Sequence, residues 1–239
     1  MKKLFFLFLL AGFTASAQKV VNDENAEKRT VTSFHAIKVS DGIDLFLSQG
    51  NEEAVAVSAS EAKYRARIIT VVEDGVLKIY YDHENNWINY NSDKKRLKAY
   101  VSFKNLDNLK GSSGADISVD GTVNVPKLDM KLSSGSSFTG KVDINNLEVD
   151  QSSGSGSNFT GKASTLTVET SSGAVFRGYD LATDFCNARA SSGGSVKVTV
   201  NKELSAKASS GGGIHYKGSG VIKDVDTGSG GSVSRSKTE

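Results

Sequence analysis

The sequence predicts an all-β protein: a right-handed parallel β-helix, or solenoid, with coils of about 19 residues and a cap of β-strands at its N-terminal end. Two observations in the second half of the chain predict this fold. One is the tripeptide Ser-Ser-Gly, which returns at nearly constant spacing, and the other is a set of apolar residues at fixed offsets from it. Helix is disfavoured there because serine and glycine recur too often for an apolar stripe of helical period.

The tripeptide has a regular period. It begins at six positions: Ser112, Ser133, Ser152, Ser171, Ser191 and Ser209. A degenerate copy, Gly228-Ser229-Gly230, follows them, and subtraction of the starting positions gives steps of 21, 19, 19, 20, 18 and 19 residues. Self-similarity in this range is typical of a solenoid, in which each repeat is one coil that stacks on the previous one.

Apolar residues alternate with polar ones around each copy. One apolar residue lies five positions before the tripeptide in five copies: Leu128, Leu147, Leu166, Cys186 and Leu204. Such alternation is typical of strands with one face in the core. Parallel strands joined by crossovers are nearly always right-handed, which predicts the hand of the solenoid. Cys186 is the only cysteine, and in this position we expect a small buried hydrophobe rather than a reactive thiol.

The tripeptide itself is interpreted as the corner of each coil. Glycine adopts positive φ at a bend more readily than other residues. Serines of stacked corners lie over one another, where their hydroxyls can hydrogen-bond along the rod or to neighbouring backbone. A nucleophilic serine needs a positioned base, and the three histidines do not recur with the motif. We therefore predict a structural role for the serines and no catalytic residue.

The N-terminal residues predict export. Lys2 and Lys3 precede a short apolar run, and Ala15-Ser16-Ala17 follows it, which together indicate a signal peptide over residues 1–17. We expect the mature protein in the periplasm or at the cell surface, with no transmembrane segment after signal removal. Residues 18–30 are polar with mixed charges and are expected to form a flexible leader.

The remainder, 31–239, is predicted to be a single β-helix domain. Residues 105–239 carry the Ser-Ser-Gly coils, and 31–104 hold a different set of strands. Alternating or apolar stretches predict these strands near 34–39, 43–47, 54–59, 68–72, 76–81 and 97–103. We expect them to cover the N-terminal end of the rod, where an open strand edge would otherwise pair with another chain.

Charge and composition exclude several classes of partner. Without Lys2 and Lys3, the 29 basic residues become 27, which balance 27 acidic residues. No basic stripe with interleaved aromatic residues stands out, so we expect no nucleic acid partner. Asp82, His83 and Glu84 would not converge on one ion from a strand, because His83 faces away from the other two. We therefore expect no metal site and no cofactor.

One segment, residues 80–90, has the composition of a ligand-binding loop. The residues that we select from it are Tyr81, His83, Trp87 and Tyr90. Aromatic faces beside amide and carboxylate groups suit sugar rings, which present apolar faces and hydroxyl edges. The alternative is a hairpin extension whose Trp87 and Ile88 pack on the flank of the rod.

Four stretches together resemble a known family. They are Phe34-x-x-Ile37-x-Val39-x-x-Gly42-Ile43-x-Leu45-x-Leu47-x-Gln49-Gly50, Val72 to Ile79, Leu97 to Val101, and the coils from Ser112. The combination, from about 34 to about 219, resembles the head GIN domain of putative auto-transporter adhesins, common in Bacteroidetes. The resemblance implies an exported, right-handed β-helical domain with a proposed role in adhesion. It implies no catalytic residues.

These observations favour an exported, non-enzymatic binding or adhesion module whose partner is a glycan or a surface protein. Two alternatives stay open. One is a carbohydrate-active enzyme on a β-helix scaffold, which would need two carboxylates that face one glycosidic bond. The other is a purely structural envelope protein. The sequence assigns neither the ligand nor the oligomeric state.

Overall fold

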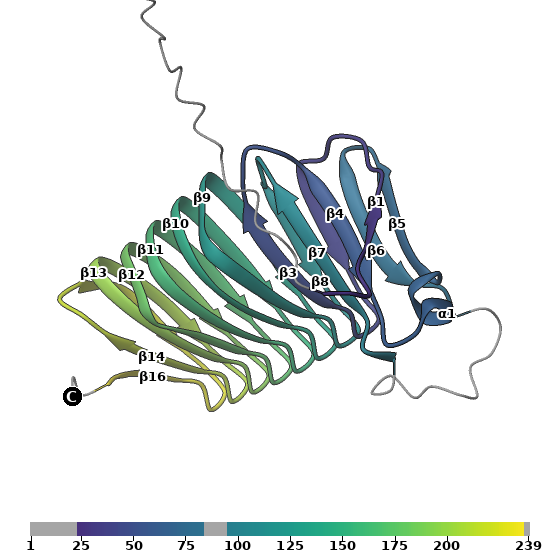
Figure 1. Ribbon diagram of the computed structural model, residues 1–239. Helices are drawn as coiled ribbons and strands as arrows, with labels where there is room; N and C mark the ends of the chain where they lie inside the picture. Colours follow the sequence, from purple (N-terminus) through teal and green to yellow (C-terminus); the bar gives the residue numbers. More distant parts are fainter. Residues whose placement is uncertain (1–22, 84–94, 237–239) are drawn as a thin grey trace, which may run out of the picture.

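The computed structural model describes residues 23–83 and 95–236, and its strands form one continuous sheet that winds into a solenoid (Figure 1). The strands before the coils are β1 (Glu27–Arg29), β2 (Ala36–Val39), β3 (Asp44–Gln49), β4 (Ala54–Ser58), β5 (Ile68–Glu73), β6 (Val76–Tyr81), β7 (Lys98–Phe103) and β8 (Asn108–Gly111). The coils are β9 (Asp116–Leu132), β10 (Ser137–Gln151), β11 (Gly156–Thr170), β12 (Val175–Ala190), β13 (Ser195–Ala208), β14 (Gly213–Lys217), β15 (Val221–Thr227) and β16 (Ser232–Arg235). A single turn of helix, α1 (Ala62–Arg65), connects β4 to β5.

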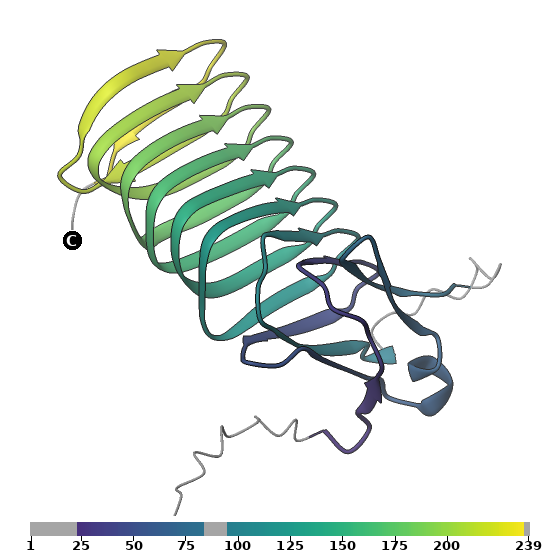
Figure 2. The same ribbon diagram turned by 90° about the horizontal axis from the view of Figure 1, so that it is seen from above.

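The predicted all-β, parallel β-helix is confirmed. Each long strand runs from one corner to the next and pairs in parallel with the strands of the neighbouring coils. Leu147 lies opposite Leu128 on one side and Leu166 on the other, so the coil repeats every 19 residues here. Viewed from above, the coils stack along one axis with their corners in line (Figure 2).

The inward side chains form one apolar core along the rod. Phe159 is fully buried, and its ring centroid lies 4.6 Å from that of Phe138 and 5.2 Å from that of Phe176. Stacked rings of this kind add to the stabilisation that burial of their area provides. Cys186 is buried in the core as predicted, and its burial raises the pKa of the thiol to about 12. A thiol with this pKa is protonated and inert at neutral pH.

The Ser-Ser-Gly tripeptides form the corners, and the backbone holds them together. In the first copy Ser113 and Gly114 both have positive φ, 52° and 73°, and the N–H of Ala115 donates to the carbonyl of Ser112. Two consecutive residues with positive φ and this hydrogen bond are typical of a type I′ turn. The N–H of Gly114 then donates to Ser134 of the next coil at 3.0 Å, and the same bond recurs from corner to corner.

At two corners a side-chain hydroxyl bridges neighbouring coils, and it belongs to the residue after the glycine, not to the serines of the motif. Ser136 Oγ donates to the carbonyl of Gly111 at 2.9 Å, and Ser155 Oγ donates to that of Leu132 at 3.1 Å. Within residues 23–83 and 95–236, no hydrogen bond uses a Ser-Ser-Gly hydroxyl. The expected ladder of these hydroxyls is therefore wrong, because the motif serines lie on the outer side of the corner.

The strands before residue 104 continue the same sheet. Strands β2 and β3 pair in parallel with β8 and β9, and the corner between them contains Asp41 and Gly42 at φ 63° and 66°. Gly42 donates its N–H to the carbonyl of Ser113. This corner is therefore the first in the stack of corners that backbone hydrogen bonds link. Strands β6 and β7 pair in parallel with β2 and β3, and β5, β4 and β1 follow in antiparallel pairing. Because these strands belong to the same sheet as the coils, the structure does not establish the expected N-terminal cap as a separate unit.

The leader differs from the expectation in part. Glu27–Arg29 pairs with β4, and Arg65 of α1 forms an ion pair with Glu27 at 3.0 Å, so a paired strand lies within the segment that was expected to be flexible. The predicted signal peptide, 1–17, lies outside the described residues, and the other domain boundaries stay a prediction. No helix among the described residues is long and apolar enough to cross a membrane.

Candidate functional site

The structure places two of the four predicted site residues, Tyr81 and His83, side by side at the end of β6. Their rings meet edge to face at 5.2 Å, but Tyr81 is only 3% exposed. The cations of Lys95 and Arg67 lie 4.4 Å and 5.3 Å from the centroid of the Tyr81 ring. Tyr81 is therefore enclosed by neighbours and offers little surface to a ligand.

Asp41 connects this region to the first corner. Its Oδ2 accepts hydrogen bonds from the N–H of Tyr81 at 3.2 Å and from Ser40 Oγ at 2.8 Å. Its Oδ1 lies 3.9 Å from His83 Nε2. The other two predicted residues, Trp87 and Tyr90, lie outside the described residues, so the four-residue site stays a prediction.

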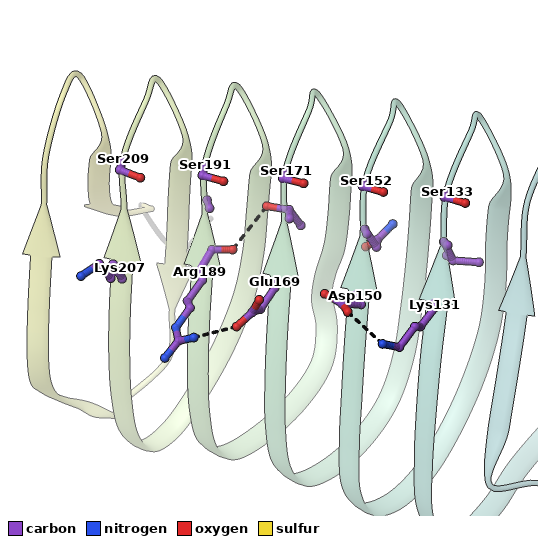
Figure 3. A pocket seen from close by; sticks show the side chains of 14 residues that line it. Lys131, Ser133, Asp150, Ser152, Glu169, Ser171, Arg189, Ser191, Lys207 and Ser209 are labelled. Carbon is purple, nitrogen blue, oxygen red and sulfur yellow. Dashed lines mark hydrogen bonds and ion pairs between the residues drawn. The ribbon is translucent and has the colours of Figure 1, made fainter.

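A groove of about 450 Å³ lies along the rod beside the Ser-Ser-Gly corners (Figure 3). One side is a row of half-exposed charged residues, which we name the charged row: Lys131, Asp150, Glu169, Arg189 and Lys207. The other side is a row of the first serines of the motif, which we name the serine row: Ser133, Ser152, Ser171, Ser191 and Ser209. We name the whole feature the corner groove.

The parallel register explains why these rows are straight. Asp150 lies opposite Lys131 and Glu169, and Arg189 lies opposite Glu169 and Lys207, so each coil contributes one residue to the row. Parallel strands place such residues about 4.8 Å apart. Figure 3 shows the serines of five coils in one line above the charged side chains.

Charges in the groove are balanced by pairs between coils. Lys131 lies 3.3 Å from Asp150, and Arg189 lies 2.8 Å from Glu169. Exposed pairs of this kind contribute only about 0–1 kcal/mol each, so the groove does not depend on them to fold. The groove thus presents groups of both charges, three basic and two acidic, and the third cation, Lys207, pairs with Asp226 outside the groove.

One of the residues that line the groove carries a buried amide. Gln151 is 3% exposed, its Oε1 accepts a hydrogen bond from Ser157 Oγ at 2.8 Å, and its Nε2 has no partner among the described residues. A buried donor without a partner is costly, which makes it a place where a ligand or a water molecule gains a hydrogen bond.

The groove is suited to a linear polar ligand. Serine hydroxyls both donate and accept, carboxylates accept, and lysine and arginine donate. Because a serine hydroxyl and a charged side chain return with every coil, a chain of hydroxyl-bearing units can lie along the rod and meet a hydroxyl and a charged group at each step. Sequence analysis missed this site, although a charged residue two positions before each full copy of Ser-Ser-Gly was a visible signal.

A pair of carboxyl groups lies on the other side of the corner. Asp44 of β3 is directly opposite Asp116 of β9. Burial, and next the negative charge of Asp116, raise the pKa of the Asp44 carboxyl. Two carboxyl groups, one with a raised pKa, are the kind of pair that sugar hydrolysis uses. No group of three or more His, Cys, Asp or Glu residues in the described parts of the chain is placed to hold a metal ion.

Known structures share this fold. A protein described as a putative adhesin from Bacteroides fragilis NCTC 9343 superposes with a TM-score of 0.78 and 15% identity, over 88% of this chain and 96% of that chain. A putative adhesin from Parabacteroides merdae ATCC 43184 has a TM-score of 0.68 and 18% identity, over 89% and 95%. A putative lipid binding protein from Parabacteroides distasonis ATCC 8503 has a TM-score of 0.64 and 18% identity, over 90% and 98%.

At these identities the structural neighbours establish the fold alone. No curated protein sequence is significantly similar to the chain. A family match is nevertheless clear, because residues 33–220 match the family described as "Putative auto-transporter adhesin, head GIN domain". As this match covers more than half of the sequence, the chain belongs to that family of putative adhesins.

Proposed function

We propose that the protein is an exported, non-enzymatic adhesion module that holds a glycan along the corner groove. The observation that carries this proposal is the register of the groove: hydroxyl and charged groups return with every coil from Lys131 to Lys207. A rigid β-helix keeps these groups in place without a ligand, so little ordering cost opposes binding. Family membership supports a role in attachment to surface molecules.

A glycan array probed with the purified protein tests the proposal, followed by titration calorimetry with each glycan that binds. The double variant Glu169→Ala/Arg189→Ala removes one ion pair from the groove. Its matched control, Asp143→Ala/Lys162→Ala, removes a pair of 3.1 Å between β10 and β11 outside the groove. We expect the first variant to weaken binding about thirtyfold and the control to leave it unchanged, since two polar contacts are lost and each is worth about 1 kcal/mol.

Equal effects of the two variants, or no binding to any glycan, would contradict the proposal. The enzyme alternative rests on the Asp44 and Asp116 pair. New reducing ends in polysaccharides incubated with the protein, lost in Asp116→Asn, would favour that alternative. The predicted site of Tyr81, His83, Trp87 and Tyr90 stays a second proposed contact for the same ligand, to which the enclosed Tyr81 contributes little surface.

A further inference from the structure

The charged row of the corner groove extends toward the N-terminus as a row of lysines. Lys110 of β8 lies opposite Lys131 of β9, Lys38 of β2 lies opposite Lys110, and Lys78 of β6 lies opposite Lys38. We name these four residues the lysine row. Sequence analysis did not find it, because its members lie in four strands that are far apart along the chain.

Four like charges in adjacent strands are unfavourable without a counter-charge. Like charges directly opposite each other across a sheet destabilise it. At the two ends of the row a carboxylate compensates: Lys78 pairs with Glu73, and Lys131 pairs with Asp150. Lys38 and Lys110, in the middle, are exposed and form no ion pair with any residue that the structure describes.

The residues beside the lysine row are those of a sugar-binding surface. The serine row continues through Ser112 to Ser40, since the corner of β2 and β3 stacks on the first Ser-Ser-Gly corner. Tyr80 lies two residues after Lys78 on the same face of β6 and is 39% exposed. An exposed tyrosine ring next to lysines and hydroxyls can stack on the apolar face of a sugar while the cations hold its acidic group.

We propose that the lysine row binds the carboxylate or sulfate groups of an acidic polysaccharide that lies along the corner groove. This inference rests on the proposed function, because it names the class of glycan that the same groove takes. The middle of the row supplies two uncompensated positive charges, and the paired half from Asp150 to Lys207 holds the neutral hydroxyl-bearing units. Acidic groups spaced along the polymer replace the missing counter-charges.

Titration calorimetry with three probes tests this inference: oligogalacturonate, chondroitin sulfate, and a neutral cello-oligosaccharide of similar length. We expect the acidic probes to bind at least about tenfold more tightly than the neutral one at low salt. Because exposed charges are screened, this preference shrinks when salt is raised from about 20 mM to about 200 mM. Lys38→Glu/Lys110→Glu should abolish the preference.

The matched control is Lys141→Glu/Lys162→Glu, which makes the same change of charge on β10 and β11 outside the groove. We expect it to keep the preference for acidic probes. Thermal unfolding of both variants checks that each is folded, which their exposed positions predict. Loss of the preference in the control as well would show a general charge effect and overturn the inference.

The outcomes separate this inference from the function on which it rests. Equal binding of neutral and acidic probes, unchanged in Lys38→Glu/Lys110→Glu, would overturn the lysine row and leave glycan adhesion standing. No binding of any glycan would overturn both. Vesicles that contain phosphatidylglycerol form a further arm, and binding to them alone, lost in Lys38→Glu/Lys110→Glu, would replace the polysaccharide by a membrane surface and overturn the inference.

Discussion

The first corner and the later Ser-Ser-Gly corners have the same backbone geometry, but the coils that meet at them differ. Around Asp41 and Gly42 the corner is tied to its surroundings by side-chain bonds, and the outward row is all lysine. Around the later corners the serine hydroxyls are unused, and the outward row contains both acidic and basic residues. The same turn geometry thus occurs beside two different surfaces, and the outward side chains vary without a change in the backbone of the coil.

The cores of the two halves differ as well. In the inward row that contains Leu47 and Val119, the next coil has Gly140, and the one after has Phe159. A Cβ on Gly140 would lie 2.8 Å from the Phe138 ring and 2.7 Å from Val119, so this glycine makes room for the aromatic stack. This inward row is therefore aliphatic at Leu47 and Val119, whereas in coils β10 to β12 glycine makes room for stacked rings.

The largest effect that we expect comes from breaking the aromatic stack. Phe159→Ala should lower the free energy of unfolding by about 3–5 kcal/mol, because it removes a buried ring and leaves a cavity between two others. Val101→Ala, its counterpart in the aliphatic part of the same inward row, should cost only about 2 kcal/mol, since two methyl groups are lost. Urea unfolding of both variants measures the difference. Equal losses would show that the two halves are packed alike.

An exchange between corners gives an intermediate effect. Asp41→Ser turns the first corner into Ser-Ser-Gly and removes the carboxylate that accepts from Tyr81 N–H and Ser40. We expect a loss of about 1–2 kcal/mol in the free energy of unfolding. The reverse change, Ser153→Asp, should be nearly neutral, because aspartate tolerates positive φ and Ser153 is exposed. A similar loss in both variants, measured by thermal unfolding, would contradict the difference between the corners.

The smallest expected effect is confined to alkaline pH and to the N-terminal half. Tyr100 stacks on Phe46 at 5.2 Å and donates its hydroxyl to Asp23 at 2.8 Å. Burial, and next the hydrogen bond to Asp23, raise the pKa of Tyr100 from 10.0 to about 12. Below pH 10 its contribution to stability is fully present. Between pH 10 and 12 the unfolded chain loses this proton first, so stability falls as pH rises.

Unfolding curves measured at several pH values between 9 and 12 check this effect. In Tyr100→Phe the decline in stability over this range should be shallower than in the wild type, because other groups titrate equally in both proteins. A decline of the same steepness in the variant would exclude Tyr100 as its source.

The regular part of the fold was readable from the sequence because it repeats. Six copies of Ser-Ser-Gly with leucines at one offset predicted the corners, the strands and the burial of Cys186. The corner at Asp41-Gly42 was not recognised as part of the solenoid, since a long stretch of sequence separates it from the next corner and it lacks the Ser-Ser-Gly motif. The sequence pattern also does not distinguish the glycines between corners, of which Gly140 makes room for the Phe138 ring and Gly161 has positive φ.

The sequence by itself determined the period, the inward residues and the corner, because each depends on neighbours within one coil. The tertiary structure decided which outward residues share a row. Lys78, Lys38, Lys110 and Lys131 come together only because β6, β2, β8 and β9 are neighbours in the sheet in an order that differs from their order in the chain. Strand pairing across long separations is set by burial of the common core, and surface residues follow it.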